Sequence, residues 1–104
     1  VEDDVNTGLL FTPGTLNELR LKNRLIKAAT FENMTPAGVP SSTLQEFHCG
    51  IADGGAAMTT LAYCAPDKTG RLKPDMMVMD EAIRAPLSSM ITAIHQRDTR
   101  VSGQ

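Results

Sequence analysis

The chain has 104 residues, of which 41% are hydrophobic and 21% charged, values typical of one globular domain with a core of its own. The net charge of −2 argues against nucleic acid as the main partner, because proteins that bind a polyphosphate backbone gather Lys and Arg on one face. No apolar run of about 18 residues and no basic segment leading into an apolar one is present, which argues against a membrane span and a secretory signal. We interpret the only dense basic stretch as a solvated turn and strand edge: Arg20, Lys22, Arg24 and Lys27.

The two cysteines, Cys49 and Cys64, are too few and too far apart for a zinc site or a disulfide scaffold. Two free thiols in a reducing compartment are the simpler explanation, which predicts a cytoplasmic protein. Cys64 ends an apolar run, and free cysteine is among the most buried residue types. We therefore expect a buried small side chain there rather than a reactive thiol.

The first predicted elements are a hairpin and a strand. Residues 1–7 are acidic and polar, which predicts a loose terminus. In residues 15–21, leucines flank a polar Asn17-Glu18 pair, a pattern typical of a short hairpin with a tight turn. The apolar run that follows is too short for a helix and predicts a buried strand at residues 25–30.

A helix and a second strand come next. Ser41 or Ser42 is a suitable N-cap, and apolar residues then recur at helical spacing as far as Gly54-Gly55. Because a glycine commonly follows the last turn of a helix, this pattern predicts a helix at residues 42–53. The apolar run that starts directly after the glycines predicts the second strand at residues 57–62.

The last third of the sequence predicts a polar loop at residues 66–74, a helix at 86–97 and a strand at 100–104. Strands that alternate with helices favour βαβ units and a parallel sheet. The order alone does not choose between an open sheet and a barrel. The glycine-rich phosphate turn of a dinucleotide-binding sheet is absent after the first strand, whereas a leading hairpin and long loops after the strands are typical of a (β/α)₈ barrel.

Several short motifs occur in one order along the chain. The first are Leu10-Phe11-Thr12-Pro13 and Leu21-Lys22-Asn23-Arg24-Leu25-Ile26. Gly54-Gly55-Ala56-Ala57-Met58 precedes the second strand, Gly70-Arg71 lies in its loop, and Val101-Ser102-Gly103-Gln104 begins the third strand. In this order and spacing they resemble the Old Yellow Enzyme family of NAD(P)H:flavin oxidoreductases, including its 2,4-dienoyl-CoA-reductase-like branch.

The resemblance implies an α/β fold, the N-terminal part of a (β/α)₈ TIM barrel with about three βα units and a leading hairpin. Residues 1–104 would form a partial FMN-binding barrel domain that is incomplete at its C-terminal end, and both ends of the sequence look like cuts. The family's substrate-binding histidines, its proton-donating tyrosine and its phosphate-binding loops are all expected beyond Gln104. The chain therefore has no catalytic residue that can be named, and no metal ligand is predicted.

The function implied is that of an FMN-dependent oxidoreductase of the ene-reductase type, which takes hydride from NAD(P)H and reduces an activated alkene. The implied partner is a small unsaturated molecule, with no nucleic acid and no membrane. The sequence leaves the oligomeric state of the full-length protein open, a homo-oligomer included. We expect activity only from a longer chain that contains this one.

Five residues match family positions that contact the flavin. Ala29, Thr30 and Phe31 fall on the first-strand positions that lie against the ring, although the hydroxyl of Thr30 comes one residue earlier than in many relatives. Ala62 falls where a backbone amide contacts the isoalloxazine, and Gln104 falls where a side-chain amide meets its pyrimidine edge. A carboxamide both donates and accepts hydrogen bonds, which suits that edge, and such bonds tune the electronics of a cofactor.

Two other functions are compatible with the sequence. One is an inactive, truncated barrel fragment that binds no flavin and serves at most as an interaction module. The other is a free-standing thiol or metal protein, which would require His48-Cys49 and His95 to meet although nothing in the pattern brings them together. Flavin absorbance in the purified protein distinguishes the enzyme from both.

Overall fold

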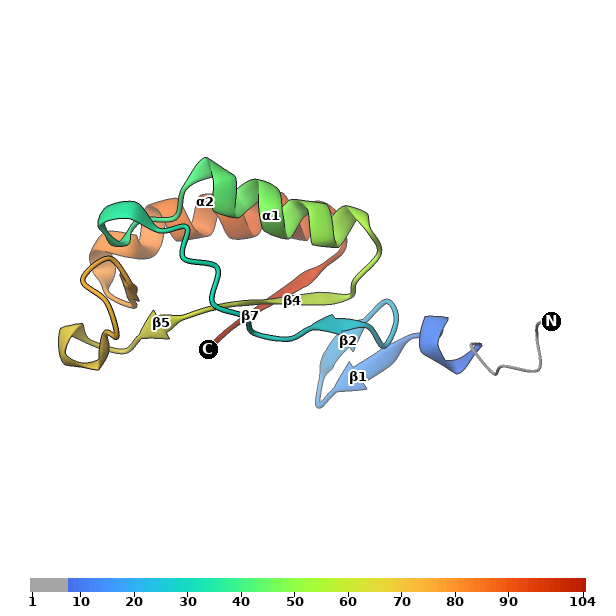
Figure 1. Ribbon diagram of the computed structural model, residues 1–104. Coiled ribbons are helices and arrows are strands. Elements are labelled where there is room, and N and C mark those ends of the chain that lie inside the picture. Colours follow the sequence, from blue (N-terminus) through green and yellow to red (C-terminus); the bar gives the residue numbers. More distant parts are fainter. Residues whose placement is uncertain (1–7) are drawn as a thin grey trace.

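The computed structural model describes residues 8–104, so the predicted loose terminus at residues 1–7 lies outside the described part of the chain. A three-stranded sheet forms its centre (Figure 1), with β3 (Ile26–Lys27), β4 (Met58–Leu61) and β7 (Arg100–Gly103) in the order β3-β4-β7. Both pairings are parallel, which confirms the βαβ units predicted from the alternation of strands and helices.

The strands are shorter than predicted at their ends. The first extends over Ile26–Lys27 instead of residues 25–30, because the chain beyond Lys27 turns away toward the first helix. Ala62 and Gln104 follow their strands directly instead of ending them. Backbone hydrogen bonds still hold Gln104 beside the segment that contains Ala62, since the Gln104 N–H donates to the Leu61 carbonyl at 3.0 Å and its carbonyl accepts from the Cys64 N–H at 2.7 Å.

Helix α1 (Ser42–Asp53) forms at the predicted residues. The Ser41 side chain is the N-cap and accepts a hydrogen bond from the Leu44 N–H at 3.1 Å. At the other end Gly55 has φ 110°, a conformation that favours glycine, and its N–H donates to the Ala52 carbonyl at 3.0 Å. The sequence therefore specifies both ends of this helix locally.

Helix α2 (Arg84–His95) begins two residues earlier than the predicted start at residue 86. A 3₁₀ turn (Glu81–Ile83) precedes it, and the Asp80 carboxylate accepts hydrogen bonds from two backbone N–H groups of this turn. This cap starts the turn early, so Pro86 lies inside the first helical turn, where its missing N–H costs no bond. Both helices cover the same face of the sheet (Figure 1). No helix in residues 8–104 has the length and apolar character needed to cross a membrane.

The predicted hairpin is present as β1 (Gly14–Leu16) and β2 (Leu19–Leu21), joined by a turn in which Asn17 has φ 55°. It lies at the N-terminal ends of the parallel strands (Figure 1), where the Arg100 side chain donates to the Arg20 carbonyl at 3.2 Å. The hairpin is therefore at the opposite end of the sheet from the residues that match flavin positions.

A second, small parallel sheet was not predicted. It pairs β5 (Cys64–Ala65) with β6 (Met77–Val78) and encloses the polar loop at residues 66–74, which contains a 3₁₀ turn (Lys68–Gly70). The buried Met76 and Met77 anchor the end of the loop, and the apolar Met-Met-Val triplet between polar segments was the available signal.

The main core lies between the two helices and the sheet. It is formed by Leu44, Cys49, Ala52, Leu61, Met77, Ile83, Leu87, Met90 and Ile94. The radius of gyration is 15.4 Å, compared with about 13 Å for a compact domain of this length, because the hairpin and the loop extend from opposite ends of the sheet. The sheet face without helices would be the interior in a closed barrel.

Candidate functional site

The residues matched to flavin positions all lie at the carboxyl end of the sheet. Ala29, Thr30 and Phe31 follow β3, Ala62 follows β4 and Gln104 follows β7. Because the three strands are adjacent and parallel, these positions come from one edge of the sheet. Ala62 is buried, whereas Thr30, Phe31 and Gln104 are exposed.

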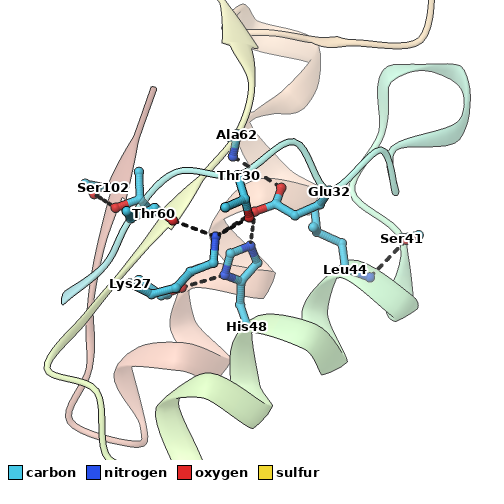
Figure 2. Close-up of polar contacts among 11 residues, drawn as sticks. Lys27, Thr30, Glu32, Ser41, Leu44, His48, Thr60, Ala62 and Ser102 are labelled. Carbon is cyan, nitrogen blue, oxygen red and sulfur yellow. Dashed lines mark hydrogen bonds and ion pairs between the residues drawn. The ribbon is translucent and has the colours of Figure 1, made fainter. Parts of the chain in front are cut away.

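A buried histidine–glutamate pair lies directly beneath this edge (Figure 2). His48, on α1, is 0% exposed and its Nε2 is 2.9 Å from Oε2 of Glu32, whose side chain is 2% exposed. Its Nδ1 is 2.7 Å from the Thr59 hydroxyl on β4. Since carboxylate oxygens only accept, Nε2 carries the proton donated to Glu32, and a neutral imidazole then accepts from Thr59 at Nδ1.

Glu32 also binds the strand end itself. Its Oε1 accepts a hydrogen bond from the Ala62 N–H at 3.2 Å, and Figure 2 shows the carboxylate between this amide and His48. One side chain thus connects the segment after β3, the helix α1 and the end of β4. The amide that matches a flavin-contacting position is already paired within the chain.

Lys27 completes this cluster and differs from the interpretation of the basic stretch as solvated. Its side chain is only 16% exposed, and its Nζ is 3.7 Å from Oε2 of Glu32. The ammonium donates to the Ala28 carbonyl and to the Thr30 hydroxyl, both at 2.8 Å. The nearby carboxylate is the physical reason that a lysine lies here, and the Thr30 hydroxyl keeps its own proton free to donate.

Two aromatic rings lie beside the strand ends. Phe31, 46% exposed, stacks on Tyr63 with a centroid separation of 5.6 Å and an angle of 11° between the ring planes. Lys73, from the loop after β5, lies 5.5 Å from the centre of the Phe31 ring and donates to the Asn33 side chain at 2.9 Å. The site therefore has an apolar wall with a cation next to it.

Cys64 follows Tyr63 and is half-buried, which agrees in part with the expected buried thiol. Burial raises the pKa of this thiol, and the negative charge of Glu32 raises it further. Cys64 is therefore a neutral thiol at physiological pH and a weak nucleophile. The second cysteine, Cys49, is buried in the main core.

We expect Cys64 to alkylate more slowly than a cysteine in a short peptide at pH 8, measured with iodoacetamide in a Cys49→Ser background. The rate should keep rising as the pH passes the ordinary thiol value of 9.0, because the thiolate forms only above the raised pKa. A rate that levels off below pH 8 would contradict this expectation.

Glu32 and His48 are the site residues that the sequence analysis missed. The sequence pattern connected His48 only with the alternative of a thiol or metal protein, and Glu32 was not singled out. The available signal was a histidine at a core position, four residues after the buried Leu44 and four before the buried Ala52, together with an acid just after the first strand. A buried polar side chain of this kind needs a partner.

Comparison with known proteins gives relatives among reductases, although no protein-family model matches the chain. The 4,4'-dithiodibutanoate disulfide reductase of Rhodococcus erythropolis is 44% identical over 98 residues, which are 94% of this chain and 24% of that protein. A metal reductase of Desulforamulus reducens is 26% identical over 99 residues, 85% of this chain and 15% of that protein. The chain thus spans about a quarter or less of the length of these relatives.

Solved structures with the same fold are also reductases. A 2-naphthoyl-CoA reductase in complex with 2-naphthoyl-CoA matches with a TM-score of 0.84 over 92% of this chain and 15% of that one, at 22% identity, which is evidence of the fold alone. Morphinone reductase matches with a TM-score of 0.79 and 27% identity over 88% of this chain and 24% of that one. A second structure of morphinone reductase, in complex with tetrahydroNAD, matches with a TM-score of 0.75.

Proposed function

We propose, from the likeness of this chain to the N-terminal part of the Old Yellow Enzyme-like barrel reductases, that the longer protein containing it is an FMN-dependent oxidoreductase. It uses NAD(P)H to reduce an activated alkene. The observation that carries the proposal is the common edge formed by the residues after β3, β4 and β7, because active sites of (β/α)₈ barrels lie at the carboxyl ends of the strands.

The residues at this edge fit a flavin in three respects. The exposed carboxamide of Gln104 is available for the pyrimidine edge, and the Thr30 hydroxyl has a proton to donate. Ala62 is small, so a planar ring can approach the strand end closely. The Ala62 N–H donates to Glu32, so a flavin contact through this amide would share that bond.

When bound, FMN would supply hydride transfer from the nicotinamide to the substrate. The described residues hold and shape the site. Glu32 and His48 fix the strand ends, Lys27 balances the carboxylate charge, and the stacked rings of Phe31 and Tyr63 form an apolar wall on one side of the edge. The groups that hold the substrate and donate a proton would come from the rest of the protein.

The proposal is tested at Gln104. In the full-length protein, Gln104→Ala should weaken FMN retention or shift the flavin potential by an amount equivalent to about 1–3 kcal/mol, the usual penalty for leaving a buried polar partner unpaired. Ultrafiltration of bound FMN and a spectroscopic redox titration measure the two effects. The matched control is Gln96→Ala, an exposed glutamine after α2, which should change neither. An unchanged FMN affinity and potential in Gln104→Ala would remove the cofactor assignment.

The 44% identical relative suggests a second candidate substrate, a disulfide. Reduction of a disulfide by NAD(P)H and a proton gives two thiols and the oxidised nucleotide, and a bound flavin would supply the hydride-transfer chemistry for it. The thiols of this chain do not favour a thiol-exchange route, because the pKa of Cys64 is raised and Cys49 is buried. Oxidation of NAD(P)H by the full-length protein with an enone and with a dialkyl disulfide distinguishes the two substrates.

A further inference from the structure

The loop between β5 and β6 gathers three cationic side chains around one pocket. The pocket has a volume of about 240 Å³ and is lined by Lys68, Arg71, Leu72, Lys73 and Pro74. No carboxylate is among the lining residues. The three cationic residues lie in the loop that follows β4 and β5. This loop is at the carboxyl end of the parallel strands, as the candidate site is.

The three charges are not neutralised by ion pairs within the described part of the chain. Neither of the flanking acids, Asp75 and Asp67, lines the pocket, and Asp67 is bound within the loop itself. Its carboxylate accepts hydrogen bonds from the hydroxyl and the N–H of Thr69, which lower the pKa of Asp67 and hold it in the 3₁₀ turn. The positive charge of the pocket therefore remains available to a ligand.

Arg71 is held in place by the loop backbone. Its Nη1 donates to the Pro74 carbonyl at 2.9 Å and its Nε to the Lys68 carbonyl at 3.4 Å. A guanidinium fixed in this way loses less conformational freedom when it binds an oxyanion. Among residues 8–104, nothing else accepts a hydrogen bond from the remaining side-chain N–H groups of Arg71.

Lys73 connects the pocket to the aromatic wall of the candidate site. The same side chain lines the pocket, donates to Asn33 and lies 5.5 Å from the centre of the Phe31 ring. Phe31 in turn stacks on Tyr63 at the ends of β3 and β4. A ligand that places an anion in the pocket can therefore place a planar apolar group beside Phe31.

We propose that this pocket binds the oxyanion, a carboxylate or a phosphate, of a ligand whose planar unsaturated or aromatic part packs beside Phe31 and Tyr63. Charge-assisted hydrogen bonds from Lys68, Arg71 and Lys73 hold the anion, and ring contacts hold the planar part. Binding of the anion does not depend on the proposed function, whereas reduction of the bound ligand does. If both hold, the substrates of the candidate site are anionic.

The test compares benzoate, phenyl phosphate and benzamide as probes of the full-length protein by ligand-observed NMR titration. We expect one or both anions to bind at least about tenfold more tightly than benzamide, the effect expected for hydrogen bonds between charged groups. In the variant Lys68→Gln/Arg71→Gln/Lys73→Gln this preference should disappear while benzamide binding is unchanged. The control Arg20→Gln/Arg84→Gln removes two exposed charges elsewhere and should leave the preference intact.

Stronger binding of benzoate identifies a carboxylate ligand, and stronger binding of phenyl phosphate identifies a phosphate-bearing one. Equal affinity for all three probes in the unaltered protein overturns the proposal, as does an anion preference that survives in the triple variant. If the triple variant does not fold, Lys73→Gln alone should lower the anion affinity severalfold. Flavin absorbance is recorded in parallel, so a colourless protein that still prefers anions would refute the proposed function and not the anion site.

Discussion

Replacing Glu32 with Leu is expected to lower the free energy of unfolding of the full-length protein by about 3–5 kcal/mol, because it leaves two buried donors unpaired at about 1–3 kcal/mol each and removes the carboxylate beside Lys27. The substitution leaves the imidazole of His48 and the N–H of Ala62 without their acceptor, and it removes the carboxylate that lies 3.7 Å from the ammonium of Lys27. Each is buried or nearly so, and water cannot replace the carboxylate without opening the strand ends. Denaturant unfolding measures the effect.

A double substitution separates this pair from the packing around it. Glu32→Leu/His48→Leu removes both members, so no imidazole is left without its acceptor, although the Ala62 N–H and the Lys27 ammonium still lose the carboxylate. We therefore expect the double variant to be more stable than the sum of the two single changes predicts. The matched control is Asp53→Asn, which breaks an exposed carboxylate–arginine pair with Arg97 at 2.8 Å and should cost less than about 1 kcal/mol. If Glu32→Leu lowers the free energy of unfolding no more than this control does, the buried Glu32–His48 pair stabilises the protein no more than an exposed ion pair.

The elements with local signals were predictable from the sequence. The first helix begins after Ser41 and ends before Gly55, and the hydroxyl cap and the positive φ each act within one or two residues of the helix end that they specify. The turn of the hairpin is specified in the same way, by the positive φ of Asn17 within the turn itself. The second helix was placed two residues late because the Asp80 cap acts through side-chain bonds that periodicity does not report.

The candidate site was predictable only in part. The positions of Thr30, Ala62 and Gln104 at strand ends follow from the strand pattern and the resemblance. The Glu32–His48 pair joins residues 16 apart, and its geometry depends on how the first helix packs against β4. The pairing of β5 with Met77–Val78 likewise depends on the path of an intervening loop. Long-range contacts of this kind leave no period in the sequence.

Residues 1–104 expressed alone are expected to be aggregated or partly folded. Among the described residues β3 and β7 are the outer strands of the sheet, and each leaves one backbone edge unpaired. Large apolar side chains are exposed near the hairpin and on the sheet face without helices: Leu9, Leu10, Phe11, Leu16, Leu19 and Ile26. Exposed apolar surface next to open strand edges favours association between chains. Circular dichroism melting and sedimentation velocity measure the outcome, and a sharp cooperative melt of a monomer would show the expectation wrong.

A single substitution should act in opposite directions on the fragment and on the full-length protein. Leu19 lies on the hairpin and is 37% exposed in this structure. If the rest of a barrel covers this end of the sheet, Leu19→Asn removes a buried apolar contact in the full-length protein and lowers its melting temperature by several degrees, as loss of about 1–2 kcal/mol does. In the isolated fragment the same change removes exposed apolar surface and should increase the soluble fraction.

Flavin absorbance of the full-length variant should stay the same, because the hairpin lies at the opposite end of the sheet from Gln104. A Leu19→Asn change that leaves the melting temperature of the full-length protein unaltered would mean that this surface faces solvent there as well.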